Sequence, residues 1–297
     1  MLPSLKRLLS SIVDYAGLFP PAQLSLPEAM NRYDRAHASP YCWMLDRFVL
    51  PANRLHEFVK LLSKETYSSQ QWSLSVILSK NWIAELEQIH QIPEAEFHCN
   101  HSVSISALEV VPLSPIEIQQ GYLNLPAEVN TFFEIPFNAD LEPYLNLLQQ
   151  LGAGAKLRTG GITHEAFPDS THLSQRILSL VDARIPFKAT AGLHHALRGK
   201  HGLTDQSESA STTMHGFLNV AIASALAYQH AITLDEAVAI LEEPSLDPFQ
   251  LGDAEISWHQ HSLSISAIER SRQQFFRSFG SCSVQEPIHD LYDLGLL

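Results

Sequence analysis

Short apolar, β-rich runs alternate along the chain with longer stretches in which apolar residues recur at helical spacing. This alternation is typical of parallel α/β folds, in which each strand is followed by a helix that covers the sheet. Proline or glycine ends most of the short runs, as expected where a strand gives way to a loop. Seven strands are predicted, at residues 12–18, 47–50, 72–78, 107–111, 131–135, 155–158 and 186–190.

A weaker eighth strand is predicted at residues 215–220, which completes the number needed for a closed barrel. We therefore predict a single α/β domain over residues 1–297 with the (β/α)8 architecture of a TIM-type barrel. An open, doubly wound sheet is the alternative. From residue 249 onward the alternation stops, so residues 249–297 are interpreted as a helical and loop extension that packs on the barrel.

Composition narrows the range of partners. With 45% hydrophobic and 17% charged residues among 297, the chain can build a large core. A net charge of −13 disfavours nucleic acid and anionic membrane surfaces, and no apolar run is long enough to span a bilayer. Three cysteines without a CxxC pattern indicate a reducing compartment, and hence a cytoplasmic protein. A small-molecule partner is therefore expected, and homo-oligomer formation stays open.

Polar residues gather where the predicted strands end. In TIM-type barrels the functional face lies at the carboxyl ends of the strands, so these residues are the candidates for chemistry. They are Asp14, Tyr15, Glu109, Glu134, Lys156, Arg158, Lys188, Thr190, His194, His195, His215 and Asn219.

Two lysines on neighbouring strands stand out among these candidates. Because side chains alternate along a strand, Lys156 and Arg158 share one face, opposite Leu157, and Lys188 shares a face with Thr190. Both lysines are therefore expected to point into the barrel. Their mutual repulsion would lower the pKa of at least one, and a neutral lysine is what an amine nucleophile or a lysine base requires. The alternative is a structural ion network with nearby carboxylates.

These two strands resemble a known family. The run KLRTG at Lys156 resembles the Lys-x-x-Thr-Gly run of deoxyribose-phosphate aldolases, and KATAG at Lys188 is similar to that family's Lys-Ala-x-x-Gly run one strand later. The resemblance implies a class I aldolase barrel in which Lys156 forms the imine and Lys188 lowers its pKa. Arg158 stands where the family has a small residue, and no motif places the family's acidic proton relay, for which Glu134 and Glu109 are candidates. The run from Asp14 to the double proline and the loop around Cys282 resemble a bacterial family to which no reaction is attached.

The residues after Lys156 predict a binding site for an anion. Arg158 offers a bidentate guanidinium, and the backbone of Thr159, Gly160 and Gly161 can approach a phosphate or carboxylate closely. At the first strand end, Asp14 and Tyr15 would place a carboxylate and a phenol in the pocket.

The histidines are assigned to substrate binding or proton transfer. They are His194, His195 and His215, with Asn219 nearby. No residue is assigned as a metal ligand and no cofactor is predicted. The alternative is a divalent metal ion held by His194 or His195 together with His215 and Glu134.

Taken together, the sequence favours a lyase of the Schiff-base aldolase type. It would act on a small oxygenated, anionic carbonyl substrate, with catalytic residues Lys156, Lys188, Glu134 and Asp14. Two alternatives remain: a metal-dependent isomerase or lyase that stabilises an enolate, and a metabolite-binding barrel without catalysis.

Overall fold

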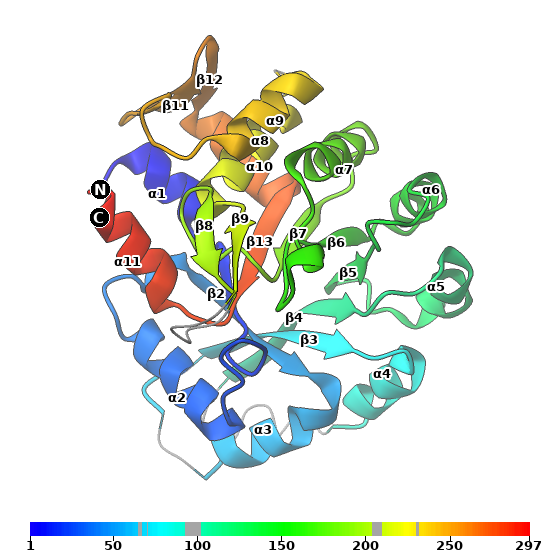
Figure 1. Ribbon diagram of the computed structural model, residues 1–297. Helices are drawn as coiled ribbons and strands as arrows, with labels where there is room; N and C mark the ends of the chain where they lie inside the picture. Colours follow the sequence, from blue (N-terminus) through cyan, green and yellow to red (C-terminus); the bar gives the residue numbers. More distant parts are fainter. Residues whose placement is uncertain (65–66, 70, 93–101, 204–209, 230–231) are drawn as a thin grey trace.

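The computed structural model describes residues 1–64, 67–69, 71–92, 102–203, 210–229 and 232–297. Eight parallel strands close into a barrel with helices around its outside (Figure 1), which confirms the predicted (β/α)8 class. The barrel strands are β1 (Val13–Tyr15), β2 (Leu45–Pro51), β3 (Gln71–Leu78), β4 (Ser102–Val110), β5 (Asn130–Glu134), β6 (Gly154–Arg158), β7 (Phe187–Thr190) and β13 (Phe276–Ser281).

Helices follow the first six barrel strands in the order that the apolar spacing predicts, and further helices follow β7 and β13. They are α1 (Pro3–Leu9), α2 (Leu26–His37), α3 (Leu55–Leu62), α4 (Trp82–His90), α5 (Pro115–Gly121), α6 (Glu142–Leu151), α7 (Ser170–Asp182), α8 (Phe217–Tyr228), α9 (Leu234–Glu242), α10 (Ile265–Gln274) and α11 (Gln285–Asp293). Local signals fix several ends: Asp169 caps α7, a Thr233–Glu236 capping box starts α9, and Gly152 ends α6 at a φ of 63°. No helix in the described part of the chain has the length and hydropathy that a bilayer span requires.

The eighth barrel strand is not where the sequence predicts it. Residues 215–220 lead into α8, which is buried on every side from Phe217 to Ala227. A helix without an exposed face has no periodic pattern, so a short piece of it looks like a buried strand. The eighth strand is β13, in the segment interpreted as an extension, and it lies between β1 and β7. Residues 249–297 therefore supply the last strand of the barrel and also elements that lie outside it.

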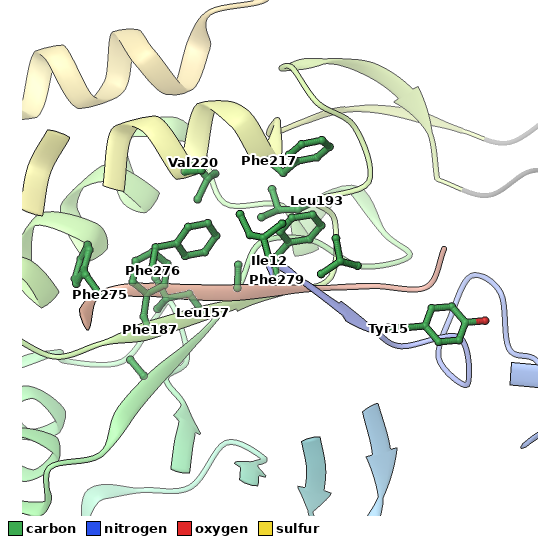
Figure 2. Packing of buried hydrophobic residues seen from close by; sticks show 14 of the residues in the cluster. Ile12, Tyr15, Leu157, Phe187, Leu193, Phe217, Val220, Phe275, Phe276 and Phe279 are labelled. Carbon is green, nitrogen blue, oxygen red and sulfur yellow. The ribbon is translucent and has the colours of Figure 1, made fainter. Parts of the chain in front are cut away.

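An irregularity in β13 explains why it looks unlike a strand. Its register with β7 shifts between Phe276 and Phe279, so these two aromatic residues, three positions apart, both pack outside the barrel. Phe276 stacks on Phe187 at 4.9 Å, and Phe279 stacks on Phe217 of α8 at 5.3 Å between ring centroids. Figure 2 shows this aromatic layer along β13. A spacing of three is a helical signal, and the register shift hides the strand's period of two.

Two small sheets lie outside the barrel. The first is an antiparallel hairpin in the connection between β7 and α8, made of β8 (Gly199–Gly202) and β9 (Ser211–Met214). The second, between α9 and α10, has three antiparallel strands: β10 (Phe249–Leu251), β11 (Glu255–Trp258) and β12 (His261–Ser264). This second sheet is the part of residues 249–297 that is an addition to the barrel.

Candidate active site

A chain of ion pairs, in which acidic and basic side chains alternate, runs through the inside of the barrel. Each member contacts the next at 2.5–3.4 Å. In order, its members are Asp46, Arg47, Asp14, Lys188, Glu109, Lys156, Glu134 and Arg158. They come from strands β1, β2, β4, β5, β6 and β7, so only the closed barrel brings them together.

Lys188 lies at the buried centre of this chain. Its Nζ contacts Asp14 Oδ2 and Glu109 Oε1, each at 2.5 Å, and its side chain is 1% exposed. Ser278 donates a hydrogen bond to Asp14 at 2.6 Å, and Ser75 donates one to Glu109 at 2.7 Å. Burial lowers the pKa of Lys188, but the two carboxylates outweigh it, so the pKa of Lys188 is raised. Lys188 is thus a charged, enclosed lysine, and repulsion from Lys156 does not make it neutral.

Glu109 joins the two lysines. Its Oε1 contacts Lys188, and its Oε2 lies 3.4 Å from Lys156 Nζ. Burial raises the pKa of Glu109, yet the charges of Lys188 and Lys156 outweigh burial and lower this pKa to about 2. Glu109 is therefore ionised at neutral pH and is a weak proton acceptor.

This depressed pKa predicts a specific acid sensitivity. A group whose pKa is lower in the folded than in the unfolded chain adds stability above its ordinary pKa, and this stability is lost as the pH falls. For Glu109 the loss is expected between about 4.5 and about 2. In urea unfolding at a series of pH values, Glu109→Gln should lower stability at pH 6 and flatten its decline below pH 4.5. An unchanged slope would contradict the assignment.

A cavity of about 390 Å³ opens at the carboxyl ends of the strands. Lys156, Glu109, Glu134 and Arg158 contribute its charged wall, and apolar side chains such as Val49 contribute much of the rest. Lys156 is the one lysine among the lining residues, and its Nζ lies 3.0 Å from Glu134 Oε2. Lys188 does not line the cavity. The two lysines thus share Glu109 but differ in position: Lys156 lines the cavity, although its side chain is only 3% exposed, whereas Lys188 does not reach the cavity wall.

Arg158 stands at the exposed end of the ion-pair chain. Its Nε donates to Glu134 Oε1 at 2.9 Å, while its side chain is 49% exposed and lines the cavity. A guanidinium has five N–H donors, so the pair with Glu134 leaves donors for a second anion. Gly161 and Thr190 also line this part of the cavity. The predicted anion-binding position is therefore accessible, although Arg158 is already paired.

Four other predicted residues are not part of the cavity wall. Asp14 is fully buried beside Lys188. Tyr15 packs against Tyr33 and Phe48, and burial raises its pKa to about 12; Figure 2 shows it directed away from the other labelled side chains. Thr159 donates to Ala191 O, which ties the loops after β6 and β7 together, and Gly160 packs against Gly192. These residues contact the residues and loops around the cavity but do not line it themselves.

His215 and Asn219 are not brought to the site. His215 contacts Pro168 O through Nε2 at 2.8 Å and does not line the cavity. Asn219 lies within α8, fully buried, and its amide donates to Ile240 O and Glu243 O. Both positions were misread because residues 215–220 are not a strand. The alternative metal site that combined His215 with Glu134 is therefore not assembled in the described residues.

The adjacent histidines have different surroundings. His194 lines the cavity, and its Nδ1 lies 3.2 Å from Glu286 and 3.9 Å from Cys282 Sγ. Burial lowers the pKa of His194, but these two partners outweigh it and raise the pKa to about 10. His195 instead contacts Asp290 at 3.1 Å and stacks on a histidine of the β8–β9 hairpin.

Sequence reasoning missed the acidic partners of these histidines. Glu286 and Asp290 lie one turn apart on α11, and both face the loop after β7. It also missed Arg47 and the serine donors Ser75 and Ser278, which hold the buried carboxylates. A spacing of four between two acidic residues on a helix was the only available signal, and it does not identify the partner.

Comparisons with known proteins do not assign a family. No family model matches the chain, and searches of curated proteins and of solved structures found no significant match.

Proposed function

We propose that this protein is a lyase of the class I, Schiff-base aldolase type, with Lys156 as the nucleophile. One observation carries the proposal: the Lys156 amine lines the cavity and lies between two carboxylates, Glu134 at 3.0 Å and Glu109 at 3.4 Å. An amine next to a proton acceptor, in a pocket at the carboxyl end of a barrel, is the arrangement that imine formation requires. The proposal rests on Lys156 alone as nucleophile, because Lys188 is enclosed.

The reaction begins with loss of a proton from the Lys156 ammonium. Glu134 is the acceptor, because it is the nearer carboxylate and because Glu109 is held ionised by both lysines. The neutral amine attacks the substrate carbonyl carbon to give a carbinolamine. Glu134 returns its proton to the carbinolamine hydroxyl, which leaves as water and gives an iminium ion. In the cleavage direction, a hydroxyl on the β-carbon gives its proton to the Glu134 carboxylate as the bond between the α- and β-carbons breaks. The electron pair of this bond moves into the iminium as an enamine.

The cycle closes without any oxidant or reductant. The enamine takes a proton at carbon, and water hydrolyses the imine to release the second carbonyl product and restore the amine. Lys188 takes no direct part in these steps. Its ion pair with Glu109 positions this carboxylate next to Lys156 and keeps it ionised. The free donors of Arg158 favour a substrate that carries a phosphate or carboxylate.

Borohydride trapping tests this proposal. The protein is incubated with a panel of small hydroxylated aldehydes and ketones, with and without phosphate groups, then reduced and digested for mass spectrometry. At least one phosphorylated compound should leave a reduced adduct on Lys156 at low concentration, and Lys156→Met should eliminate it. Lys80, which is exposed, is the internal reference for random labelling.

Two outcomes would contradict the proposal. One is labelling of Lys156 no faster than Lys80 with every compound. The other is thermal stabilisation by a compound that leaves no adduct, which would favour a metabolite-binding barrel without catalysis.

A further inference from the structure

Three side chains that commonly ligate metals meet at the rim of the cavity. His194 comes from the loop after β7, Cys282 directly follows β13, and Glu286 lies in the first turn of α11. One ligand atom from each lies within 4.8 Å of the other two, and no other such group occurs in the described residues. These three residues are distinct from the ion-pair chain that contains Lys156. We propose that they bind one divalent transition-metal ion, with zinc as the best-suited example.

The distances fit a single ion. Tetrahedral zinc, with bonds of about 2.0 Å to nitrogen and oxygen and about 2.3 Å to sulfur, holds nitrogen and oxygen roughly 3.3 Å apart and nitrogen and sulfur roughly 3.5 Å apart. Here His194 Nδ1 lies 3.2 Å from Glu286 Oε2 and 3.9 Å from Cys282 Sγ. A shift of a few tenths of an ångström at the sulfur brings the nitrogen–sulfur distance to this value. Cys282 Sγ and the Glu286 oxygen lie within 4.8 Å of each other and would approach to roughly 3.5 Å around the ion.

The use of one ring nitrogen also favours a metal over a catalytic triad. In a nucleophile–histidine–carboxylate relay, the two ring nitrogens contact different partners. In this site Nδ1 of His194 faces both Cys282 and Glu286, so the three donors converge on one point. Convergence on one point is what an ion needs, and it leaves no nitrogen between the thiol and the carboxylate to carry a proton from one to the other.

The turn that carries two of the ligands is held by its own hydrogen bonds. Ser281 Oγ donates to Ser283 O at 2.7 Å, and the backbone N–H of Glu286 donates to Ser283 Oγ at 3.2 Å. Cys282 is 6% exposed, which protects a metal–thiolate bond from solvent. Ordered ligands lose little freedom on binding, which favours affinity.

The donor set and its position indicate the class of ion and its role. Imidazole, thiolate and carboxylate together suit zinc or cobalt and not magnesium or calcium, which prefer oxygen. Three protein ligands leave a fourth position open, as in catalytic zinc sites. His194 and Cys282 line the same cavity as Lys156, so the fourth ligand would be water or a substrate oxygen. Such an ion would polarise a carbonyl or hydroxyl group of the molecule in the cavity.

Cobalt titration of the full chain tests this site, because cobalt reports its ligands by absorption. The protein is stripped with a chelator under reducing conditions and titrated with Co²⁺. We expect one ion per chain, visible bands of tetrahedral intensity and a near-ultraviolet thiolate-to-cobalt band. Cys282→Ser should remove the thiolate band, and His194→Ala and Glu286→Gln should each weaken binding at least about tenfold. Added Zn²⁺ should displace the cobalt.

Matched variants give the control. Cys42→Ser removes the other cysteine in the described part of the chain and His195→Gln the adjacent histidine, and both should leave the cobalt spectrum unchanged. Circular dichroism verifies that each variant is folded. The absence of binding at 100 μM Co²⁺, or a thiolate band that persists in Cys282→Ser, would overturn the proposal. Lys156 is not a ligand, so this result is independent of the borohydride experiment.

Discussion

Replacing Lys188 with methionine is expected to lower the free energy of unfolding by about 3–5 kcal/mol, because it leaves buried carboxylates without their nearest cation. Asp14 and Glu109 are each at most 1% exposed, and each lies 2.5 Å from Lys188 Nζ. Methionine approximates the length of the lysine chain, so the loss reflects charge more than packing. Urea unfolding at neutral pH, followed by circular dichroism, measures the change.

Lys156→Met is the matched comparison for this experiment. It leaves Glu109 with Lys188 at 2.5 Å and Glu134 with Arg158 at 2.9 Å, so each carboxylate keeps a close cation. A smaller loss of stability is expected than for Lys188→Met. Adding Glu109→Gln to Lys188→Met should restore part of the lost stability, because one unpaired buried charge is removed. Equal losses for the two methionine variants, with no restoration, would contradict the central role of Lys188.

Phe279→Ala is expected to cost about 3–5 kcal/mol, the range for a large aromatic side chain removed from a core. Phe279 is fully buried between β13 and α8, where it stacks on Phe217. If residues 276–281 only covered the barrel from outside, Phe279→Ala would lower the free energy of unfolding by much less. Urea unfolding of this variant therefore tests whether the tail supplies a barrel strand.

Tyr292→Ala serves as the control in the same C-terminal region. Tyr292 is 60% exposed on α11, so its removal should change stability by no more than about 0.5 kcal/mol. A comparable loss at Phe279 and Tyr292 would mean that the tail is not part of the core.

Seven of the eight barrel strands were predictable from local pattern. Short apolar runs ended by proline or glycine mark them, and the helices between them have one apolar face each. The exceptions share a cause. Helix α8 is buried all around and β13 contains a register shift, so neither has the periodicity that its structure normally imposes.

For the site, strand parity was sufficient to direct Lys156, Arg158 and Lys188 to the inside of the barrel, with Leu157 outside. The alternation of side chains along a strand does not predict how deep in the barrel each inward-facing side chain lies. Lys156 and Lys188 are paired in register on adjacent strands, yet only Lys156 lines the cavity. The difference arises from Asp14 on β1 and Glu109 on β4, which enclose the Lys188 amine.

The sequence by itself determined the barrel class, the order of its first seven strands and the inward face of the two lysines, because these depend on neighbours close along the chain. The closed tertiary structure decided which strand completes the barrel, which lysine lines the cavity, and how His194, Cys282 and Glu286 meet. These features join residues far apart in the chain, such as Ser278 and Asp14, which are hydrogen-bonded across 264 positions. No local pattern encodes such pairings, since they exist only once the last strand has closed the barrel beside the first.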